Sequence, residues 1–290
     1  MKTKQTVQCG VLACLLALVT PLPASAALHI YPVFKGGLPP ATNVIGGGNL
    51  QSIFQVAAQA WEKVFSNGDD DWNVTIEYLW GPLGGGLFGQ ETMLKQGGSP
   101  VRITRSQIVF NNTPQWDQTF KSYFFDPSPR DNSEFLRYTS DRVNTDQGQI
   151  NAGRVLNEPL SEDLVNSKDL LTLAMHEIGH SLGLDGDYIG FQRQLGTNEF
   201  GQYAVTVTLP RPYAGLAIAI DNGPHIGGFP YSVLLTQYET TAGERKFISA
   251  VDALMIAQLS SFARPNLSEP IWETPIRSPN PGQDQDQNQQ

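Results

Sequence analysis

Residues Ser167–Asp187 read SKDLLTLAMHEIGHSLGLDGD and contain the most informative motif of the chain. It contains His176, Glu177 and His180 in the order H-E-x-x-H. Positions four apart lie on one face of an α-helix, so both imidazoles point at a common ion while the glutamate projects beside them. Gly183 follows at the point where the helix must stop and the chain must turn, which favours a residue free to adopt positive φ. The stretch therefore predicts a metal-binding helix.

The predicted helix has a start signal and an apolar back. Asp169 is a good N-cap, because its side chain can accept hydrogen bonds from the free N–H groups of the first turn. The apolar residues available for burial recur at helical spacing. They are Leu170, Leu171, Leu173, Ala174, Ile178 and Leu182.

The residue types of the motif are suited to zinc-assisted hydrolysis. A catalytic zinc ion takes three protein ligands and leaves a fourth position for water, whose pKa it lowers toward ~7. Glu177 is placed to remove the proton from that water and to pass it on to a leaving amine. His176 and His180 supply only two such ligands, so a complete catalytic site of this kind needs a third from another residue.

The sequence HEIGHSLGLDGD, residues 176–187, resembles the zinc-binding consensus H-E-x-x-H-x-x-G-x-x-H of the metzincin metallopeptidases, particularly the matrixin-like branch. The shared consensus positions are His176, Glu177, His180 and Gly183. The resemblance implies an α+β, zincin-like fold with a mixed twisted sheet, the H-E-x-x-H active-site helix and a C-terminal helix. It also implies a zinc-dependent endopeptidase that acts on a protein or peptide substrate.

The chain departs from this consensus at the third ligand, because residue 186 is glycine. His225 lies 45 residues after His180 in the segment GPHIGG, and we expect it to complete the site. Residues 187–224 are then an insertion, as in the leishmanolysin-like metzincins. Asp187 and Asp185 flank the consensus position and remain alternatives, since carboxylates also bind zinc, as does a site without a third ligand.

A second departure concerns the methionine that the family places in a turn beneath the metal. Leu234 or Leu235 stands at that place, and Met255 falls on the predicted C-terminal helix. Together with Gly186, this difference supports an alternative hypothesis of a catalytically inactive binding or surface protein with a metzincin fold. A zinc hydrolase acting on a non-peptide bond is a third hypothesis that no residue favours.

Hydrophobic periodicity predicts an α+β order of elements around the motif. The expected strands are residues 28–34, 74–80, 101–110, 149–155, 202–209 and 211–220, and the expected helices are residues 50–65 and 249–259. The glycine-dense residues 81–89 are expected to form a loop. We expect residues 111–145 to form long connections with at most one further strand.

The first 26 residues are typical of an export signal. Lys2 and Lys4 precede the apolar run Val11–Val19, and Ala24–Ala26 contains a small-residue cleavage site. We therefore expect a secreted protein, extracellular or, in a Gram-negative bacterium, periplasmic. Residues 27–265 are expected to form the catalytic domain, and the Pro/Gln-rich residues 266–290 a disordered tail.

Composition restricts the partners and cofactors. The formal net charge is −9, and removal of the signal leaves 17 basic against 28 acidic residues, which argues against nucleic acid and membrane surfaces. Cys9 and Cys14 both precede residue 27, so the expected mature chain has no disulfide or thiolate ligand. Asp131–Phe135 offers oxygens to a structural calcium ion but lacks a clear calcium-binding motif. We expect a monomer.

Overall fold

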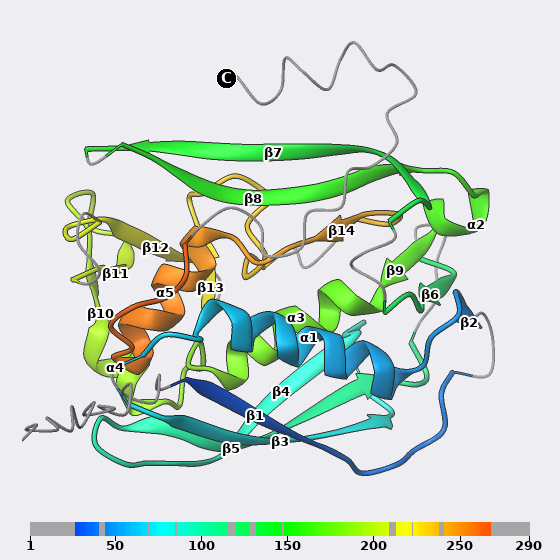
Figure 1. Cartoon of the computed structure of the whole chain (residues 1–290), viewed down its shortest axis with the longest axis horizontal. Coiled ribbons are helices and arrows are strands. Elements are labelled where there is room, and N and C mark those ends of the chain that lie inside the picture. The colour runs from blue at the N-terminus through cyan, green and yellow to red at the C-terminus, as the bar shows by residue number, and fades with distance from the viewer. Residues whose placement is uncertain are drawn as a thin grey trace, which may run out of the picture.

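The computed structural model describes residues 27–40, 44–68, 70–84, 86–114, 120–127, 132–146, 148–208, 213–221, 223–237 and 241–267. The expected export signal and residues 268–290 of the expected tail lie outside this part of the chain. At the coarse level the fold is α+β, as expected, with a few helices and several small sheets (Figure 1). The first residues of the expected tail contact the domain, because Asn266 N donates to Val64 O at 2.6 Å.

A mixed four-stranded sheet lies at the bottom of Figure 1 and has the order β1-β3-β5-β4. Strands β1, β3 and β5 are parallel, and β4 runs antiparallel to β5 at the edge. Their bounds are Leu28–Phe34 (β1), Trp72–Gly81 (β3), Gly89–Gly97 (β4) and Arg102–Asn111 (β5). The three parallel strands confirm the predictions for residues 28–34, 74–80 and 101–110. Strand β4 was not predicted.

Helices α1 (Leu50–Val64) and α3 (Leu170–Ser181) cover one face of this sheet (Figure 1). Asn49 and Ser52 form a capping box at the start of α1, and the apolar stripe of α1 is buried as its periodicity predicted. The indole Nε1 of Trp61 donates to Met175 O at 2.9 Å, which fixes α1 to the middle of α3. Helix α5 (Ala250–Ser260) packs nearby and confirms the predicted C-terminal helix.

A long hairpin of β7 (Phe135–Thr145) and β8 (Gly148–Pro159) crosses the top of Figure 1. Strand β7 is the one further strand allowed for residues 111–145, but the three residues Ser122–Phe124 form another, and the predicted strand Gln149–Val155 is only part of β8. Only Phe135 of β7 is buried and its other residues are half-buried or exposed, so its sequence lacks the apolar alternation by which strands are recognised. The hairpin contacts the segment that contains Ser232, Leu234 and Leu235, which is called the loop before α5 below. There, Ser232 Oγ donates to the Asp141 carboxylate.

Smaller elements surround the start of α3. The three-residue strand β9 (Ser167–Asp169) pairs in parallel with β6 (Ser122–Phe124), which pairs with β2 (Val44–Ile45). The short helix α2 (Glu162–Val165) precedes β9. On the other side, β14 (Arg245–Lys246) pairs with β8. Strand β9 ends at Asp169, directly before α3 begins, so its pairing with β6 fixes the start of that helix.

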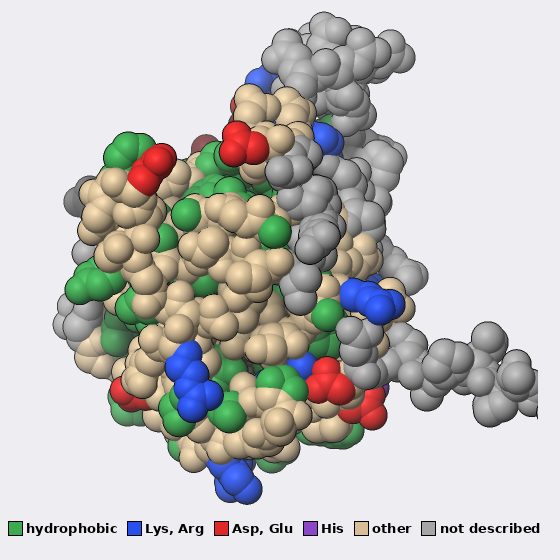
Figure 2. All heavy atoms as spheres, turned by 90° about the vertical axis from the view of Figure 1, so that its left-hand side faces the viewer, with side chains coloured by type: hydrophobic (Ala, Val, Ile, Leu, Met, Phe, Trp, Pro, Cys, Tyr) green, Lys and Arg blue, Asp and Glu red, His purple; other side chains and the backbone are tan. Residues whose placement is uncertain are grey.

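Residues after α3 form a second four-stranded sheet, which is antiparallel and has the order β10-β11-β12-β13. Helix α4 (Ile189–Gln194) precedes it, and its strands are Leu195–Thr197, Tyr203–Thr206, Ala217–Asp221 and His225–Gly227. The predicted strand 202–209 contains β11, whereas the predicted strand 211–220 begins only at Ala217, because residues 213–215 turn. Charged side chains are scattered on the face in Figure 2, which looks at this side of the molecule.

Among the described residues, no helix combines the length and apolar character needed to cross a membrane.

Candidate metal centre

Helix α3 places His176 and His180 in the interior of the protein. Its N-cap is Asp169, as predicted, whose carboxylate accepts hydrogen bonds from Thr172 N at 3.1 Å and Thr172 Oγ1 at 2.7 Å. Every residue of α3 is buried, including both histidines and Glu177, because the helix passes between α1, β4 and the loop before α5. The helix is thus held rigidly at its start and along its length.

A buried ion pair secures the N-cap. Arg245 is fully buried, and its guanidinium donates to both carboxylate oxygens of Asp169, at 3.0 and 2.9 Å. It also donates to Asn132 Oδ1 at 2.9 Å and to Asp126 Oδ2 at 3.3 Å. Burial acts to lower the pKa of Arg245, but the attraction and hydrogen bonds of the two aspartates outweigh burial and raise that pKa.

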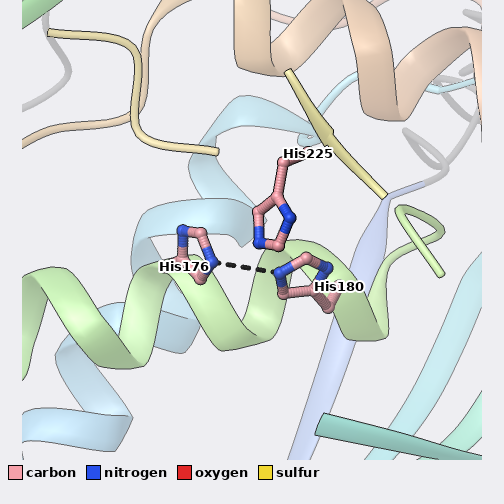
Figure 3. A group of neighbouring side chains, drawn as sticks. All are labelled: His176, His180 and His225. Carbon is pink, nitrogen blue, oxygen red and sulfur yellow. Dashed lines mark hydrogen bonds between the residues drawn. The ribbon is translucent and has the colours of Figure 1, made fainter. Parts of the chain in front are cut away.

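The structure brings His225, the first residue of β13, to the two histidines of α3 (Figure 3). Its ring centroid lies 5.5 Å from that of His176 and 5.0 Å from that of His180. The Nε2 atoms of His176 and His180 are 3.0 Å apart, and one ligand nitrogen from each of the three residues lies within 4.8 Å of the others. Two nitrogens bound tetrahedrally to one zinc ion are ~3.4 Å apart, so the three rings fit such an ion.

Backbone carbonyls orient the two rings on α3. His176 Nδ1 donates to Leu234 O at 3.0 Å, and His180 Nδ1 donates to Leu184 O at 2.6 Å. A carbonyl oxygen only accepts, so each Nδ1 carries the proton of its neutral ring and each Nε2 is the unprotonated nitrogen that can bind an ion. Burial, followed by the neighbouring His180 and His225, lowers the pKa of His176 well below its usual value. The neutral imidazole that a metal requires is therefore the favoured form.

The loop that accepts from His176 is itself held by helix α5. The carboxylate of Asp252 accepts from Leu234 N at 3.1 Å and from Leu235 N at 2.9 Å, and it closes the capping box with Ser249. Burial raises the pKa of Asp252, and these hydrogen bonds act in the opposite direction. Leu234 and Leu235 are fully buried, and Leu235 packs against Gly179 of α3. Buried leucines thus stand at the positions where the family resemblance led us to expect a methionine.

Glu177 lines a cleft with a volume of about 450 Å³ that His176, His180 and His225 also line. One wall is α3 with the turn after it, and the opposite wall is the beginning of β4. Glu177 is 3% exposed, and its carboxylate lies beside the backbone of Gly89. The arrangement places a carboxylate beside a group of nitrogen ligands in a space open to a substrate.

The alternative ligands Asp185 and Asp187 lie on the wall of the same cleft. Neither belongs to the group that could hold a metal ion. The Asp185 carboxylate accepts from Asp187 N at 2.6 Å, which gives it a role in the turn after α3. Gly183 has φ +136°, as the turn required, and Gly186 has open space beside it.

Among the described residues, these three histidines are the one group of three or more potential ligands close enough to hold an ion. Residue 131, the first of the segment considered for calcium, lies outside the described residues. Its neighbour Asn132 contacts Arg245.

Glu91 is a cleft residue that sequence reasoning missed. It lies on β4, and its carboxyl oxygen Oε1 is buried. Burial, followed by the charge and hydrogen bond of Asp185 and the charge of Glu177, raises the pKa of Glu91 to about 10. The apolar side chains of Gly89–Gly97 are Met93 and Leu94, which are adjacent in sequence. The segment therefore lacks the alternation of apolar and polar residues that predicts a strand.

Comparisons of the chain with protein-family models, with curated proteins and with solved structures found no match.

Proposed function

We propose that the protein is an exported zinc-dependent endopeptidase with a metzincin-like fold. The observation that carries the proposal is the convergence of His176, His180 and His225 beside the carboxylate of Glu177 in an open cleft. Three imidazoles with a free fourth position are a typical catalytic zinc site, and a carboxylate next to that position is typical of hydrolysis.

In this proposal the three histidines hold zinc, and Glu177 moves the proton. When bound, zinc supplies a Lewis acid that lowers the pKa of water toward ~7 and polarises a substrate carbonyl. The Glu177 carboxylate accepts the proton of the attacking water and then delivers it to the nitrogen of the leaving amine. Its burial between α3 and β4 keeps bulk water from competing for that proton.

The walls of the cleft favour an extended peptide as the substrate. Strand β4 is the last strand of its sheet, so the backbone groups on its outer side have no strand partner within that sheet. An extended chain can pair with such an edge, which would lay a scissile bond along the cleft beside Glu177. This arrangement supports a protein or peptide substrate over other hydrolysable bonds.

A binding protein without catalytic activity is the second candidate. It is favoured by the two departures from the metzincin consensus, Gly186 at the third-ligand position and leucine at residues 234 and 235 in place of the turn methionine. The retention of Glu177 beside the histidines favours an enzyme, because a binding site has no need of a base.

The test is to measure bound zinc and casein cleavage for the wild type and three variants. Glu177→Ala is expected to keep zinc and to lose cleavage by a factor of ~10²–10⁴, the usual contribution of a general base. His225→Ala is expected to lose zinc and activity, whereas Asp187→Ala, on the same cleft wall, is expected to keep both. Full zinc and activity in His225→Ala would refute the ligand assignment. A wild type that binds zinc, cleaves nothing and matches Glu177→Ala would favour the binding protein.

A further inference from the structure

Strand β4 contacts the side chain of Glu177 at Gly89. A Cβ atom added at residue 89 would lie 2.5 Å from Glu177 Oε1 and 3.0 Å from both Cδ and Cγ. Three atoms of the glutamate therefore occupy the space that any other residue's side chain would need. The backbone conformation does not explain the glycine, because Gly89 is not among the glycines with positive φ.

The backbone around Gly89 is held in place from the sheet side. Gly89 pairs with Phe110 of β5, and the preceding carbonyl, Phe88 O, accepts from Asn111 N at 2.8 Å. The side chain of Asn111 also donates to Leu87 O at 2.7 Å. Tyr123 OH donates to Phe88 O as well, at 3.3 Å. These bonds oppose a retreat of β4 from α3.

The backbone of Glu177 is equally fixed. It follows His176, whose ring is bonded to Leu234 O, and lies two residues after Met175, whose carbonyl accepts from Trp61. Since neither backbone can yield at low cost, a methyl group at residue 89 is accommodated most readily by rotation of the Glu177 side chain.

We propose that Gly89 is a positioning residue, whose missing side chain provides the space that sets the location of the Glu177 carboxylate. The inference rests on the proposed function, because it concerns the group that we assign as the general base. The beginning of β4 then determines the position of the Glu177 carboxylate, and that position requires glycine at residue 89.

The first test compares Gly89→Ala with Gly97→Ala. Gly97 is on the same strand, has nothing within 4 Å of an added Cβ and has no positive φ, so it is a matched control. Gly89→Ala is expected to retain one zinc per chain and an unchanged KM, while kcat falls by ~100-fold, as for other small misplacements of a reacting group. Gly97→Ala is expected to match the wild type. An undiminished kcat in a folded Gly89→Ala protein would overturn the inference.

The second test does not depend on activity. Gly89→Ala is expected to lower the melting temperature in the wild-type background and to have little effect in a Glu177→Ala background, where the clash is gone. A crystal structure of Gly89→Ala is expected to show the Glu177 carboxylate displaced and the three histidines in place. If Gly89→Ala does not fold, recovery of folding in the double variant supports the same conclusion.

Two further results would overturn the inference: equal destabilisation in both backgrounds, or an unmoved Glu177 in the crystal structure. If the wild type cleaves no peptide, the proposed function fails, while the melting temperatures and the crystal structure still decide whether residue 89 positions Glu177.

Discussion

His176 Nδ1 donates to the carbonyl oxygen of Leu234, which is 3.0 Å away and 58 residues later in the chain. The hydrogen bond connects a proposed ligand on α3 to the loop before α5. That loop is held in turn by Asp252, which accepts from the backbone N–H groups of Leu234 and Leu235. The orientation of the ring therefore depends on a carboxylate that never reaches the cleft.

Asp252→Asn is expected to weaken zinc binding although it leaves all three histidines intact. The amide offers one accepting oxygen where the carboxylate has two, so the loop and Leu234 O lose support. Loss of such outer contacts usually costs ~10–100-fold in metal affinity. Titration against a chromogenic chelator measures the Kd. Ser260→Ala is the control, since it removes a buried hydroxyl of α5 that, within the described part of the chain, donates to Ile256 O. Equal zinc Kd values for Asp252→Asn and the wild type would show that the loop needs no carboxylate.

Arg245→Met is expected to destabilise the fold by ~3–5 kcal/mol, because it leaves Asp169 and Asp126 buried without their cation. Urea unfolding followed by fluorescence measures the change. Arg137→Met is the matched control: its partner Glu158 lies 3.2 Å away and both side chains are half exposed, so the loss should be under ~1 kcal/mol. Similar small losses in both variants would contradict the importance of the buried pair.

Glu91→Gln is expected to make the metal-free protein less sensitive to alkali. The pKa of Glu91 is about 10 in the folded protein against 4.5 for the ordinary group. The native state therefore holds a proton that the unfolded chain releases, so stability falls as pH rises from about 4.5 toward about 10, by at most ~1.4 kcal/mol per pH unit. Glutamine removes this dependence.

The measurement for Glu91→Gln is the urea midpoint at several pH values between about 5 and 9, and Glu199→Gln, at an exposed turn, is the control. Metal-free protein is required because a bound dication lowers the pKa of nearby carboxyl groups. Parallel pH profiles for wild type and Glu91→Gln would contradict the assignment.

Gly183→Ala is expected to destabilise the protein by ~1–3 kcal/mol and to raise the zinc Kd. Gly183 has φ +136°, and an added Cβ would lie 3.2 Å from the ring of Tyr188. Strain there would shift the turn that brings Leu184 O to His180 Nδ1. Gly186→Ala is the control for stability, since it has open space and no positive φ. Calorimetry measures the change in stability, and chelator titration measures the zinc Kd. Equal stability of Gly183→Ala and Gly186→Ala would refute the expectation.

The part of the site that sequence could predict is the local part. His176, Glu177 and His180 follow from helical spacing alone, and Asp169 is recognisable as a cap because capping acts over three residues. His225 lies 45 residues after His180, so helical spacing could not place it in the site. It was expected there because the chain has only four histidines.

The remainder could not be predicted, because it depends on contacts that leave little trace in sequence. Strand β4 is recognisable only once β5 pairs with it, since its two apolar side chains, Met93 and Leu94, are adjacent and do not alternate with polar ones. The supports of the histidine rings are backbone carbonyls of Leu184 and Leu234, which every residue possesses. Likewise, the need for glycine at residue 89 can be seen only from the packing of Glu177 of α3 against it.

The position of His225 on β13 would give a bound ion a mechanical role. With zinc bound, α3 and the sheet β10-β13 are tethered across a loop of 45 residues, in a protein whose described residues include no cysteine. Because the three ligands come together only in the folded chain, zinc would stabilise that state by mass action, by about 4 kcal/mol at a free concentration ~1,000-fold above its Kd. Zinc would thus act as this chain's cross-link, and a chelator that removes it would loosen the sheet β10-β13 and open that part of the chain to proteolysis.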